Sequence, residues 1–431
     1  MDTTQLAWYL APAAALIAWY AFRRQRAERR HSRTLEDARA AGLTEPPSLH
    51  PVVDPTLCIG SASCVRACPE KALGVVEGRA TLVAPASCIG HGACEASCPV
   101  RAITLVFGTE RRGVDIPQVD PHFETNVRGV FIAGELGGMG LIRKAAEQGR
   151  QAVRKIASRP RTGAPIDVFI VGAGPAGIAA GLAAVDAKLA YRLIEQESDL
   201  GGSVYHYPRH KIAMTQPVDL PLVGAMRFTE VSKEALLAFW RRIVGTTGLV
   251  VHTSERFERL EPRGGRFSVV TDRGAYEAGA VLLAIGRRGT PRKLGVPGED
   301  RPKVVYRLID ASQYRGQRVL VVGGGDSAVE AALACAAVEG TTTALAYRGD
   351  AFSRVKPANR ERLEAARDAG RIDVLLRTDV VSIGEEAVEV DLAGERRTID
   401  NDAVIVQAGG VLPTEVLRSI GIAIETKRGS A

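Results

Sequence analysis

The chain has 431 residues, 46% of them hydrophobic and 45 of them glycines, with a formal net charge of +7. This length is enough for two to four domains, and the composition fits an α/β protein with many tight turns. Six arginines stand in residues 23–33, and no basic stripe interleaved with aromatic residues occurs elsewhere. Because the positive charge is concentrated in this one short run, the sequence argues against nucleic-acid binding.

An uncharged apolar stretch, residues 6–22, stands at the start of the chain. As a helix it would be about 25 Å long, against about 30 Å for a hydrocarbon core, and tryptophan and tyrosine at both ends suit the membrane interfaces. The positive charges follow the stretch, unlike those of a signal peptide. We therefore predict a transmembrane helix at 5–22, a basic juxtamembrane linker at 23–53 and a single-pass protein of the cytoplasmic membrane whose other domains face the cytoplasm. Pro12 and the alanines leave a buried or amphipathic helix as the alternative.

Six of the seven cysteines repeat one spacing, C-x5-C-x3-C-P, in residues 58–69 and 88–99. The bacterial two-cluster ferredoxin pattern has one more cysteine in each run, and Ser61 and His91 stand at those positions here. In that pattern the last cysteine of each run binds the cluster of the other run. We therefore predict two iron-sulfur clusters, one on Cys58, Cys64 and Cys98 and the other on Cys88, Cys94 and Cys68.

The fourth ligand of each cluster stays open. Either a three-iron cluster (3Fe-4S) lacks the corner, or the last iron of a four-iron cluster (4Fe-4S) takes Ser61, His91 or an outside molecule. The three-iron form is favoured at Ser61 because a hydroxyl must lose a proton to bind well. The spacing argues against a zinc site, because zinc sites usually contain C-x2-C pairs and neither run has one. Disulfides would need an oxidising compartment, which the predicted cytoplasmic location argues against. Both runs continue into an apolar stretch, so residues 54–107 are predicted to form a small α+β domain of ferredoxin type.

A strand predicted at 167–171 leads directly into GAGPAG and an alanine-rich helix. In this dinucleotide fingerprint the first glycine makes the turn, the second lets the backbone approach the pyrophosphate and the third allows close helix packing. The free N–H groups of the helix suit the phosphates. The next strand ends in an acid that can accept the ribose hydroxyls. The predicted binding residues are Gly172, Gly174, Pro175, Ala176, Gly177 and Glu195.

The same pattern recurs after a strand predicted at 318–322. The following strand ends in Tyr347 and Arg348, where an NAD-binding protein would carry an acid. A 2′-phosphate is therefore plausible, and NADPH is favoured over NADH. An exposed charge without a ligand is the alternative for Arg348. The predicted NAD(P) residues are Gly323, Gly325, Asp326, Ser327, Ala328, Arg348 and Arg354.

From residue 110 onward the chain resembles the thioredoxin-reductase-like branch of the pyridine nucleotide-disulfide oxidoreductases, flavoproteins with two dinucleotide-binding domains. The matching stretches are residues 172–177, 200–208, 282–299, 323–333 and 403–413. The resemblance implies two Rossmann-like domains: an FAD domain at 164–289 and 400–431, and an inserted NAD(P) domain at 290–399. It also implies hydride transfer from the nicotinamide to the flavin, and further FAD contacts from Gly201, Gly202 and Gly286.

Two departures from these flavoproteins bear on function. Thioredoxin reductases carry a redox C-x-x-C before the second fingerprint, and the matching residues 304–318 contain no cysteine. Cys335, the seventh cysteine, stands in an apolar helical run and reads as a buried structural thiol. A dithiol relay is therefore missing, and the two clusters offer the electrons of the flavin another exit.

The second departure concerns the order of the motifs along the chain. These flavoproteins end in an FAD-contacting motif that resembles T-N-V-P-G-V-F-A-A-G-D, followed by a helix. Here the match, residues 123–157, stands before GAGPAG. We predict a circular permutation that moves the last piece of the FAD domain to residues 110–158, with Ala133, Gly134 and Glu135 beside the flavin's ribityl and phosphate side. A ferredoxin-tail loop of accidental likeness is the alternative.

Together these features predict a membrane-anchored oxidoreductase that passes electrons between NAD(P)H, FAD, two iron-sulfur clusters and a one-electron partner. No catalytic side chain is assigned, because the cofactors carry the chemistry. The partner would be a ferredoxin, a cytochrome or a quinone-linked complex, and a homodimer is compatible with the sequence. The alternatives are a reductase of a disulfide or another small substrate, with residues 205–211 lining its pocket, and a non-enzymatic redox-sensing or anchoring subunit.

Overall fold

The computed structural model describes residues 3–46, 49–110, 113–138, 140–207, 209, 211–287, 290–352, 355–411 and 413–429. The chain forms two compact units. Unit 1 comprises Met1–Val114, Ala351–Pro357 and Lys427–Ala431, and unit 2 comprises Asp115–Asp350 and Ala358–Thr426.

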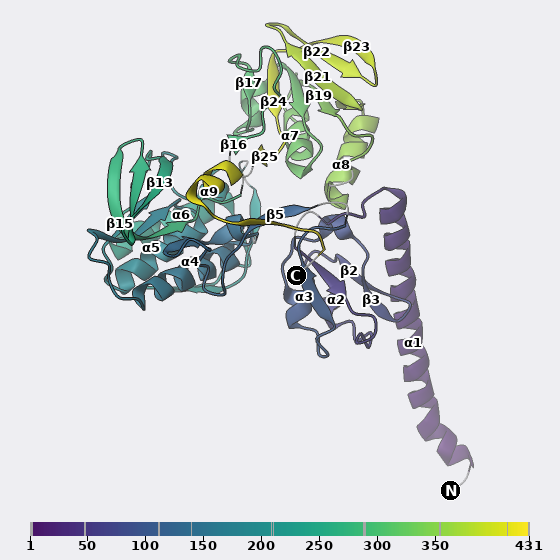
Figure 1. Cartoon of the computed structure of the whole chain (residues 1–431). Helices are drawn as coiled ribbons and strands as arrows, with labels where there is room; N and C mark the ends of the chain where they lie inside the picture. Colours follow the sequence, from purple (N-terminus) through teal and green to yellow (C-terminus); the bar gives the residue numbers. More distant parts are fainter. Residues whose placement is uncertain are drawn as a thin grey trace. The chain divides into compact units, whose positions relative to one another are not determined.

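Unit 1 contains the cysteine repeat (Figure 1). Its strands are short and form two antiparallel pairs, β1 with β4 and β2 with β3. Each run of cysteines contributes one short helix, α2 or α3. The elements are α1 (Thr3–Ala40), β1 (His50–Val53), α2 (Ser63–Ala67), β2 (Leu73–Val76), β3 (Arg79–Leu82), η1 (Pro85–Ser87), α3 (Ala93–Ala96) and β4 (Ile103–Val106).

Helix α1 corrects the prediction for the N-terminal region. It runs without a break from the apolar stretch through the arginine run, with Pro12 inside it. Among the residues that the structure describes, no helix is long and apolar enough to cross a membrane, so the predicted transmembrane helix at 5–22 is not supported. Alanines make up much of the stretch, and six arginines follow it within the same helix.

The predicted linker at 23–53 is also corrected. Residues 23–40 continue α1, and strand β1 pairs antiparallel with β4, with Val53 opposite Ile103. The cysteine-rich domain therefore includes residues before 54. The sequence reasoning missed this because a four-residue strand carries little pattern, and its partner lies at the other end of the domain.

The first dinucleotide fold of unit 2 is built on a six-stranded sheet in the order β13-β14-β15-β7-β8, with β6 also paired to β15. Residues 168–171 of β7 are buried, as expected for a central strand covered on both faces. The sheet comprises β6 (Val130–Ile132), β7 (Ile166–Val171), β8 (Tyr191–Ile194), β13 (Phe257–Arg263), β14 (Arg266–Thr271) and β15 (Gly274–Leu283). The neighbouring helices are α4 (Ile142–Ala157), α5 (Pro175–Asp186) and α6 (Lys233–Thr247).

The second fold has a parallel sheet in the order β17-β24-β18-β19-β20 and a three-stranded antiparallel sheet, β21-β22-β23. Its elements are β17 (Val304–Val305), η4 (Ala311–Tyr314), β18 (Arg318–Val322), α7 (Asp326–Ala336), β19 (Thr342–Tyr347), α8 (Pro357–Asp368), β20 (Ile372–Leu376), β21 (Thr378–Ile383), β22 (Ala387–Leu392), β23 (Glu395–Asp400) and β24 (Ala403–Val406). The remaining elements are β5 (Val114–Pro117), η2 (Gly134–Gly137), η3 (Gly202–Val204), β9 (Ile212–Met214), β10 (Val218–Leu220), β11 (Gly224–Met226), β12 (Glu230–Ser232), β16 (Thr290–Pro291), β25 (Gly410–Val411), α9 (Thr414–Ile420) and β26 (Ile424–Lys427).

Residues 115–158 are built into the first dinucleotide fold. Strand β6 pairs in parallel with β15, with Phe131 opposite Leu282, and helix α4 lies beside α5 (Figure 1). A Cβ on Gly149 of α4 would lie 2.0 Å from the carbonyl oxygen of Ala176, so the two helices approach too closely for any larger residue there.

The same segment also meets the last residues of unit 2. Strand β5 pairs with β26, and the Gln118 N–H donates to the Ala423 carbonyl over 2.9 Å. The Asn126 side chain donates to the Gly421 carbonyl over 2.9 Å and accepts the Ala423 N–H over 2.8 Å. Segments far apart in the sequence therefore form one continuous piece of structure.

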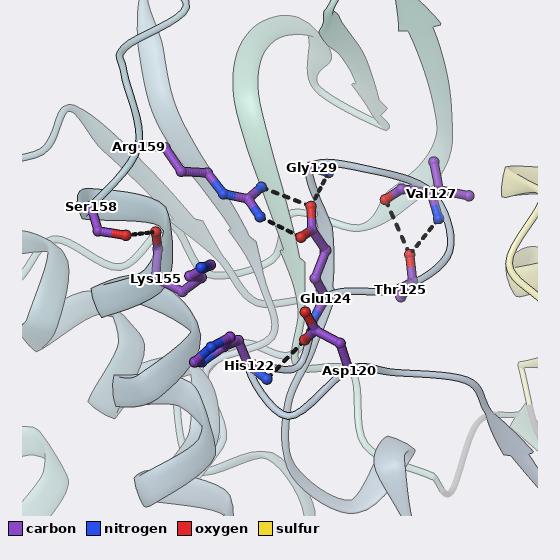
Figure 2. A network of polar contacts seen from close by, with 9 residues as sticks. All are labelled: Asp120, His122, Glu124, Thr125, Val127, Gly129, Lys155, Ser158 and Arg159. Atoms are coloured by element: carbon purple, nitrogen blue, oxygen red, sulfur yellow. Dashed lines mark hydrogen bonds and ion pairs between the residues drawn. The ribbon is translucent and has the colours of Figure 1, made fainter.

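A polar network closes the 115–158 segment on itself (Figure 2). The Glu124 carboxylate accepts N–H groups of the Arg159 guanidinium and the Gly129 N–H, the latter over 2.7 Å. The Asp120 carboxylate accepts the backbone N–H groups of His122 and Glu124 over 2.8 and 2.9 Å. The loop before β6 is thereby fixed to the end of α4.

This network predicts a pH-dependent stability. The hydrogen bond from Arg159 holds the pKa of Glu124 below its usual range. Losing a charged hydrogen bond costs about 2 kcal/mol, so Glu124→Gln is expected to lower the thermal unfolding midpoint by several degrees at pH 7. Because the folded-state pKa is lowered, the contribution is complete above the ordinary glutamate pKa of about 4.3 and is lost as the pH falls through the folded value.

The measurement is the unfolding midpoint of both proteins between pH 7 and the lowest pH at which the chain stays folded. Glu261→Gln is the control, because that carboxylate is exposed and pairs only with exposed arginines. A difference between wild type and Glu124→Gln that does not shrink in acid would contradict the assignment.

Candidate cluster and dinucleotide sites

The six repeated cysteines line two separate hollows in unit 1. One hollow, called the first site, is lined by Cys58, Cys64 and Cys98 together with Ser61. The other, the second site, is lined by Cys68, Cys88 and Cys94 together with His91. Each hollow thus takes two cysteines from one run and the last cysteine of the other run, which is the crossed grouping that the sequence predicts.

The donor set fits an iron-sulfur cluster. Among the described residues, no three histidine, cysteine or acidic side chains converge as they would on a single metal ion. A cluster has several irons, each taking its own thiolate, so its ligands surround a larger space than those of one ion. Apart from Ser61 at the first site and Glu70 and His91 at the second, the lining around the cysteines is largely glycine, alanine, proline and aliphatic side chains.

Burial controls the chemistry of these thiols. It raises the pKa of Cys64 and Cys88, and it raises the pKa of Cys94 to about 11. A free thiolate is therefore disfavoured in both hollows, and iron binding would have to displace the protons.

The two non-cysteine positions differ. Ser61 is exposed, and its hydroxyl oxygen lies 3.4 Å from both the hydroxyl oxygen and the backbone nitrogen of Ser63. His91 is partly buried, and its Nδ1 atom is shielded from solvent. Both lie at the hollow predicted for them, and the choice between ligand and open corner stays open.

The first dinucleotide fingerprint has the expected geometry. Gly172 has a φ of +102°, and a Cβ there would lie 2.6 Å from the Ala284 carbonyl oxygen. Gly174 precedes the first residue of α5 as its N-cap. A Cβ on Gly177 would lie 1.7 Å from the Gly172 carbonyl oxygen, so only glycine permits this approach of α5 to β7. Pro175 and Ala176 form the first turn of α5, where N–H groups are free for phosphate.

Glu195 lies at the end of β8 and is only 5% exposed. Its carboxylate accepts the Ala173 N–H over 2.8 Å and the Glu197 N–H over 3.1 Å, which holds it beside the glycine turn. Burial raises the pKa of this carboxyl. The position suits a carboxylate that accepts ribose hydroxyls.

Other predicted FAD residues gather at the same turn. A Cβ on Gly202 would lie 2.9 Å from Gly174 Cα, and a Cβ on Gly134 would lie 3.1 Å from Ala176 Cβ. The Gly134 N–H donates to the Gln148 side chain over 2.8 Å, a contact that the sequence reasoning missed. Three further predicted residues stand next to these in the chain: Ala133 is buried, Glu135 is partly buried and Gly201 has a φ of +117°. Gly286, with a φ of +68°, is distant in sequence, and a Cβ there would lie 3.8 Å from Ser203 Oγ.

The second fingerprint is similar but more open. A Cβ on Gly323 would lie 2.4 Å from the Gln407 carbonyl oxygen, whereas Gly325, the N-cap of α7, has nothing within 4 Å. Asp326, Ser327 and Ala328 form the first turn of α7, and Arg348 is exposed at the end of β19. Arg354 lies outside the described residues. The Tyr347 ring lies against Gly324, where a Cβ would come within 2.1 Å of it.

Cys335 is fully buried in α7, and burial raises its pKa to about 12. Such a thiol has almost no thiolate at neutral pH and no access to a substrate. The alternative prediction has residues 205–211 line a substrate pocket. Among them, Lys211 forms an ion pair with Glu330 of α7, with its Nζ 2.7 Å from the Glu330 Oε1.

Comparison with known proteins matches these folds. Residues 169–430 match the family described as pyridine nucleotide-disulphide oxidoreductase, and residues 50–99 match a 4Fe-4S dicluster domain. The chain belongs to the pyridine nucleotide-disulphide oxidoreductase family. It is an FAD-dependent NAD(P)H oxidoreductase, and its cofactors are FAD, NADP(H) and the iron-sulfur clusters of an attached 4Fe-4S dicluster domain.

Among curated proteins, this oxidoreductase is similar to a ferredoxin–NADP reductase of Thermus thermophilus, with 32% identity over 61% of the chain and 78% of the relative. A bacilliredoxin reductase of Bacillus subtilis is 28% identical over 61% of the chain and 82% of the relative. Among solved structures, the bacillithiol disulfide reductase of Staphylococcus aureus gives a TM-score of 0.53 at 27% identity, covering 60% of the chain and 81% of that structure.

Proposed function

We propose that this oxidoreductase passes electrons between NADPH and a one-electron partner through FAD and its own two clusters. The observation that carries the proposal is the distribution of the cysteines: six line the two hollows, and the seventh is buried with a pKa raised to about 12. No exposed thiol is left to relay electrons from the flavin. FAD supplies the conversion between a hydride and single electrons when it is bound.

The roles proposed for the side chains are binding and positioning. Gly172, Gly174 and Gly177 would let the FAD pyrophosphate approach the start of α5, and Glu195 would accept the ribose hydroxyls. The three cysteines of each hollow would hold one cluster, with Ser61 and His91 beside the fourth iron. In the second fold the glycine turn and Arg348 would hold NADPH, and Arg348 would pair with the 2′-phosphate.

An anaerobic titration with NADPH, and separately with NADH, tests the proposal. Flavin absorbance and low-temperature electron paramagnetic resonance are followed together in the cluster-loaded protein. We expect the flavin to bleach and the cluster signals then to change, with NADPH the more effective donor. If the flavin is reduced while neither cluster changes its paramagnetic signal, the proposed route is wrong for electron flow from NADPH to the clusters.

A substitution tests the choice of nucleotide. Arg348→Ala is expected to raise the KM for NADPH about tenfold and leave the KM for NADH unchanged, because only the 2′-phosphate loses a charged hydrogen bond. Arg362→Ala is the control, since Arg362 is exposed on α8. An equal change for both nucleotides would assign Arg348 to the shared part of the cofactor or to the fold.

We also propose that residues 110–158 are the displaced last piece of the FAD domain. The support is the pairing of β6 with β15, the contact of α4 with α5 and the hydrogen bonds between residues 118–126 and 421–423. In the proposed arrangement, the stretch that resembles the family's final motif lies beside the fingerprint glycines. A loop of accidental likeness would have no reason to fill that position.

The proposed partner is a ferredoxin-type or cytochrome-type redox protein, and a homodimer or a quinone-linked complex stays within the proposal. Attachment to a membrane is proposed from the exposed Leu16, Ile17, Trp19, Tyr20 and Phe22, which precede the arginine run. Flotation with anionic vesicles tests the attachment, and a chain that stays at the bottom of the gradient would rule it out.

Reduction of a disulfide is the second candidate, and the similarity to the bacilliredoxin reductase of Bacillus subtilis and the bacillithiol disulfide reductase of Staphylococcus aureus favours it. Because Cys335 is buried, such a reaction would have to use the flavin directly. Consumption of NADPH with bacillithiol disulfide, but with no one-electron acceptor, would support this candidate over the first.

A further inference from the structure

Backbone N–H groups donate to cysteine sulfurs at both cluster sites. The Ala102 N–H donates to Cys98 Sγ over 3.2 Å at the first site, and its counterpart in the repeat, the Ala72 N–H, donates to Cys68 Sγ over 3.4 Å at the second. The Ala80 N–H donates to Cys58 Sγ over 3.4 Å, whereas Cys88, the equivalent of Cys58, accepts the N–H of Gly90 and has its Sγ 3.8 Å from the Leu49 carbonyl oxygen. The donor to Cys58 therefore comes from outside the cysteine loop, and the donor to Cys88 lies within it.

The bond to Cys58 comes from the hairpin of β2 and β3. Ala80 is a buried residue of β3, and Gly78, at the hairpin turn, has a φ of +74°. The turn lies against the cysteine loop of the first site, since a Cβ on Gly60 would come within 2.0 Å of the Gly78 carbonyl oxygen. The position of the hairpin therefore sets the distance from the Ala80 N–H to the sulfur.

Helix α1 holds this hairpin at two points. The Glu28 carboxylate accepts the Gly78 N–H over 2.8 Å, and His31 Nδ1 accepts the Val75 N–H over 3.0 Å. The imidazole lies flat enough on the strand that a Cβ on Gly74 would meet its ring at 2.7 Å. One contact fixes the turn and the other fixes strand β2, so the hairpin cannot move relative to α1 without losing a hydrogen bond.

We propose that Glu28 and His31 are positioning residues for the first cluster site, and that the hydrogen bond they maintain from Ala80 to Cys58 raises the reduction potential of the first cluster. An added electron makes a cluster and its thiolates more negative, so an N–H group aimed at a cysteine sulfur stabilises the reduced form more than the oxidised form. The inference rests on the proposed cluster binding, but not on the NADPH route.

The consequence is that α1 controls the surroundings of the first cluster. Any partner that displaces or tightens α1 would change the potential of that cluster alone.

The test is a redox titration of the full-length, cluster-loaded protein with dithionite, followed by electron paramagnetic resonance at low temperature. The first-site signal is identified as the one lost in Cys98→Ala. We expect its midpoint potential to be lower in Glu28→Ala with His31→Ala than in the wild type, with the second-site potential unmoved. Glu28→Gln keeps an acceptor for the Gly78 N–H and should retain most of the wild-type value.

Glu36→Ala is the matched control, because Glu36 is an exposed carboxylate on the same helix and should leave both potentials unchanged. If the double variant fails to hold the first cluster, the single Glu28→Ala variant decides. An unchanged first-site potential, or a shift that is equal at both sites, would overturn the proposal. Since dithionite replaces NADPH as the reductant, failure of the proposed electron route would not affect this result.

Discussion

Replacing Cys98 with alanine is expected to abolish the cluster of the first site and to spare the cluster of the second site. Cys98 stands in the second run of cysteines, yet it lines the hollow of Cys58 and Cys64. Removing one of only three thiolates leaves two, too few to hold a cluster whose fourth corner is already without cysteine. The bound iron should fall by about half, and one of the two paramagnetic signals should vanish.

The reciprocal variant and a control complete the test. Cys68→Ala should remove the signal that Cys98→Ala retains, because Cys68 lines the second hollow. Cys335→Ala should keep both clusters, since that thiol is buried in α7 of the other unit. If Cys98→Ala instead removed the cluster of Cys88 and Cys94, the crossed assignment would be wrong.

The second large effect is expected from Gly149→Ala. Gly149 belongs to α4, in the segment proposed to be displaced, and a Cβ there would lie 2.0 Å from the Ala176 carbonyl oxygen in the fingerprint turn. The contact is with backbone, so no side-chain rotation can relieve it, and overpacking of this kind costs about 1–3 kcal/mol or more. The shift falls on the residues proposed to receive the FAD pyrophosphate. We expect most of the bound FAD to be lost and the thermal midpoint of unit 2 to fall.

Gly245→Ala is the matched control. It makes the same substitution within a helix, α6, at a position where nothing lies within 4 Å of the added Cβ. Alanine is the better helix former by about 1 kcal/mol, so this variant should keep its FAD and gain slightly in stability. Full FAD content in Gly149→Ala would show that α4 is not part of the FAD site, and would count against the permutation.

The chemistry-bearing residues of this protein could be predicted from the sequence because their spacing is local. A cluster ligand run and a dinucleotide fingerprint each need particular residues within a short stretch, and the glycines at 172, 174 and 177 follow from that geometry alone. The repeated pattern also predicts the crossed grouping of cysteines, and the cysteines line the two hollows in that grouping. The family assignment rests on the match over residues 169–430.

The features that only the tertiary structure decided depend on contacts between residues that are far apart in the chain. In sequence, residues 23–53 resemble a linker. Nothing in the arginine run indicates that Glu28 and His31 accept hydrogen bonds from a hairpin more than forty residues later in the chain. The pairing of β1 with β4 and the close approach of Gly149 to Ala176 are equally nonlocal. The spacing of residues along the chain determines which side chains and backbone groups can bind a cofactor. Tertiary packing determines the environment of those groups, because hydrogen bonds and contacts depend on distance in space and not on distance along the chain.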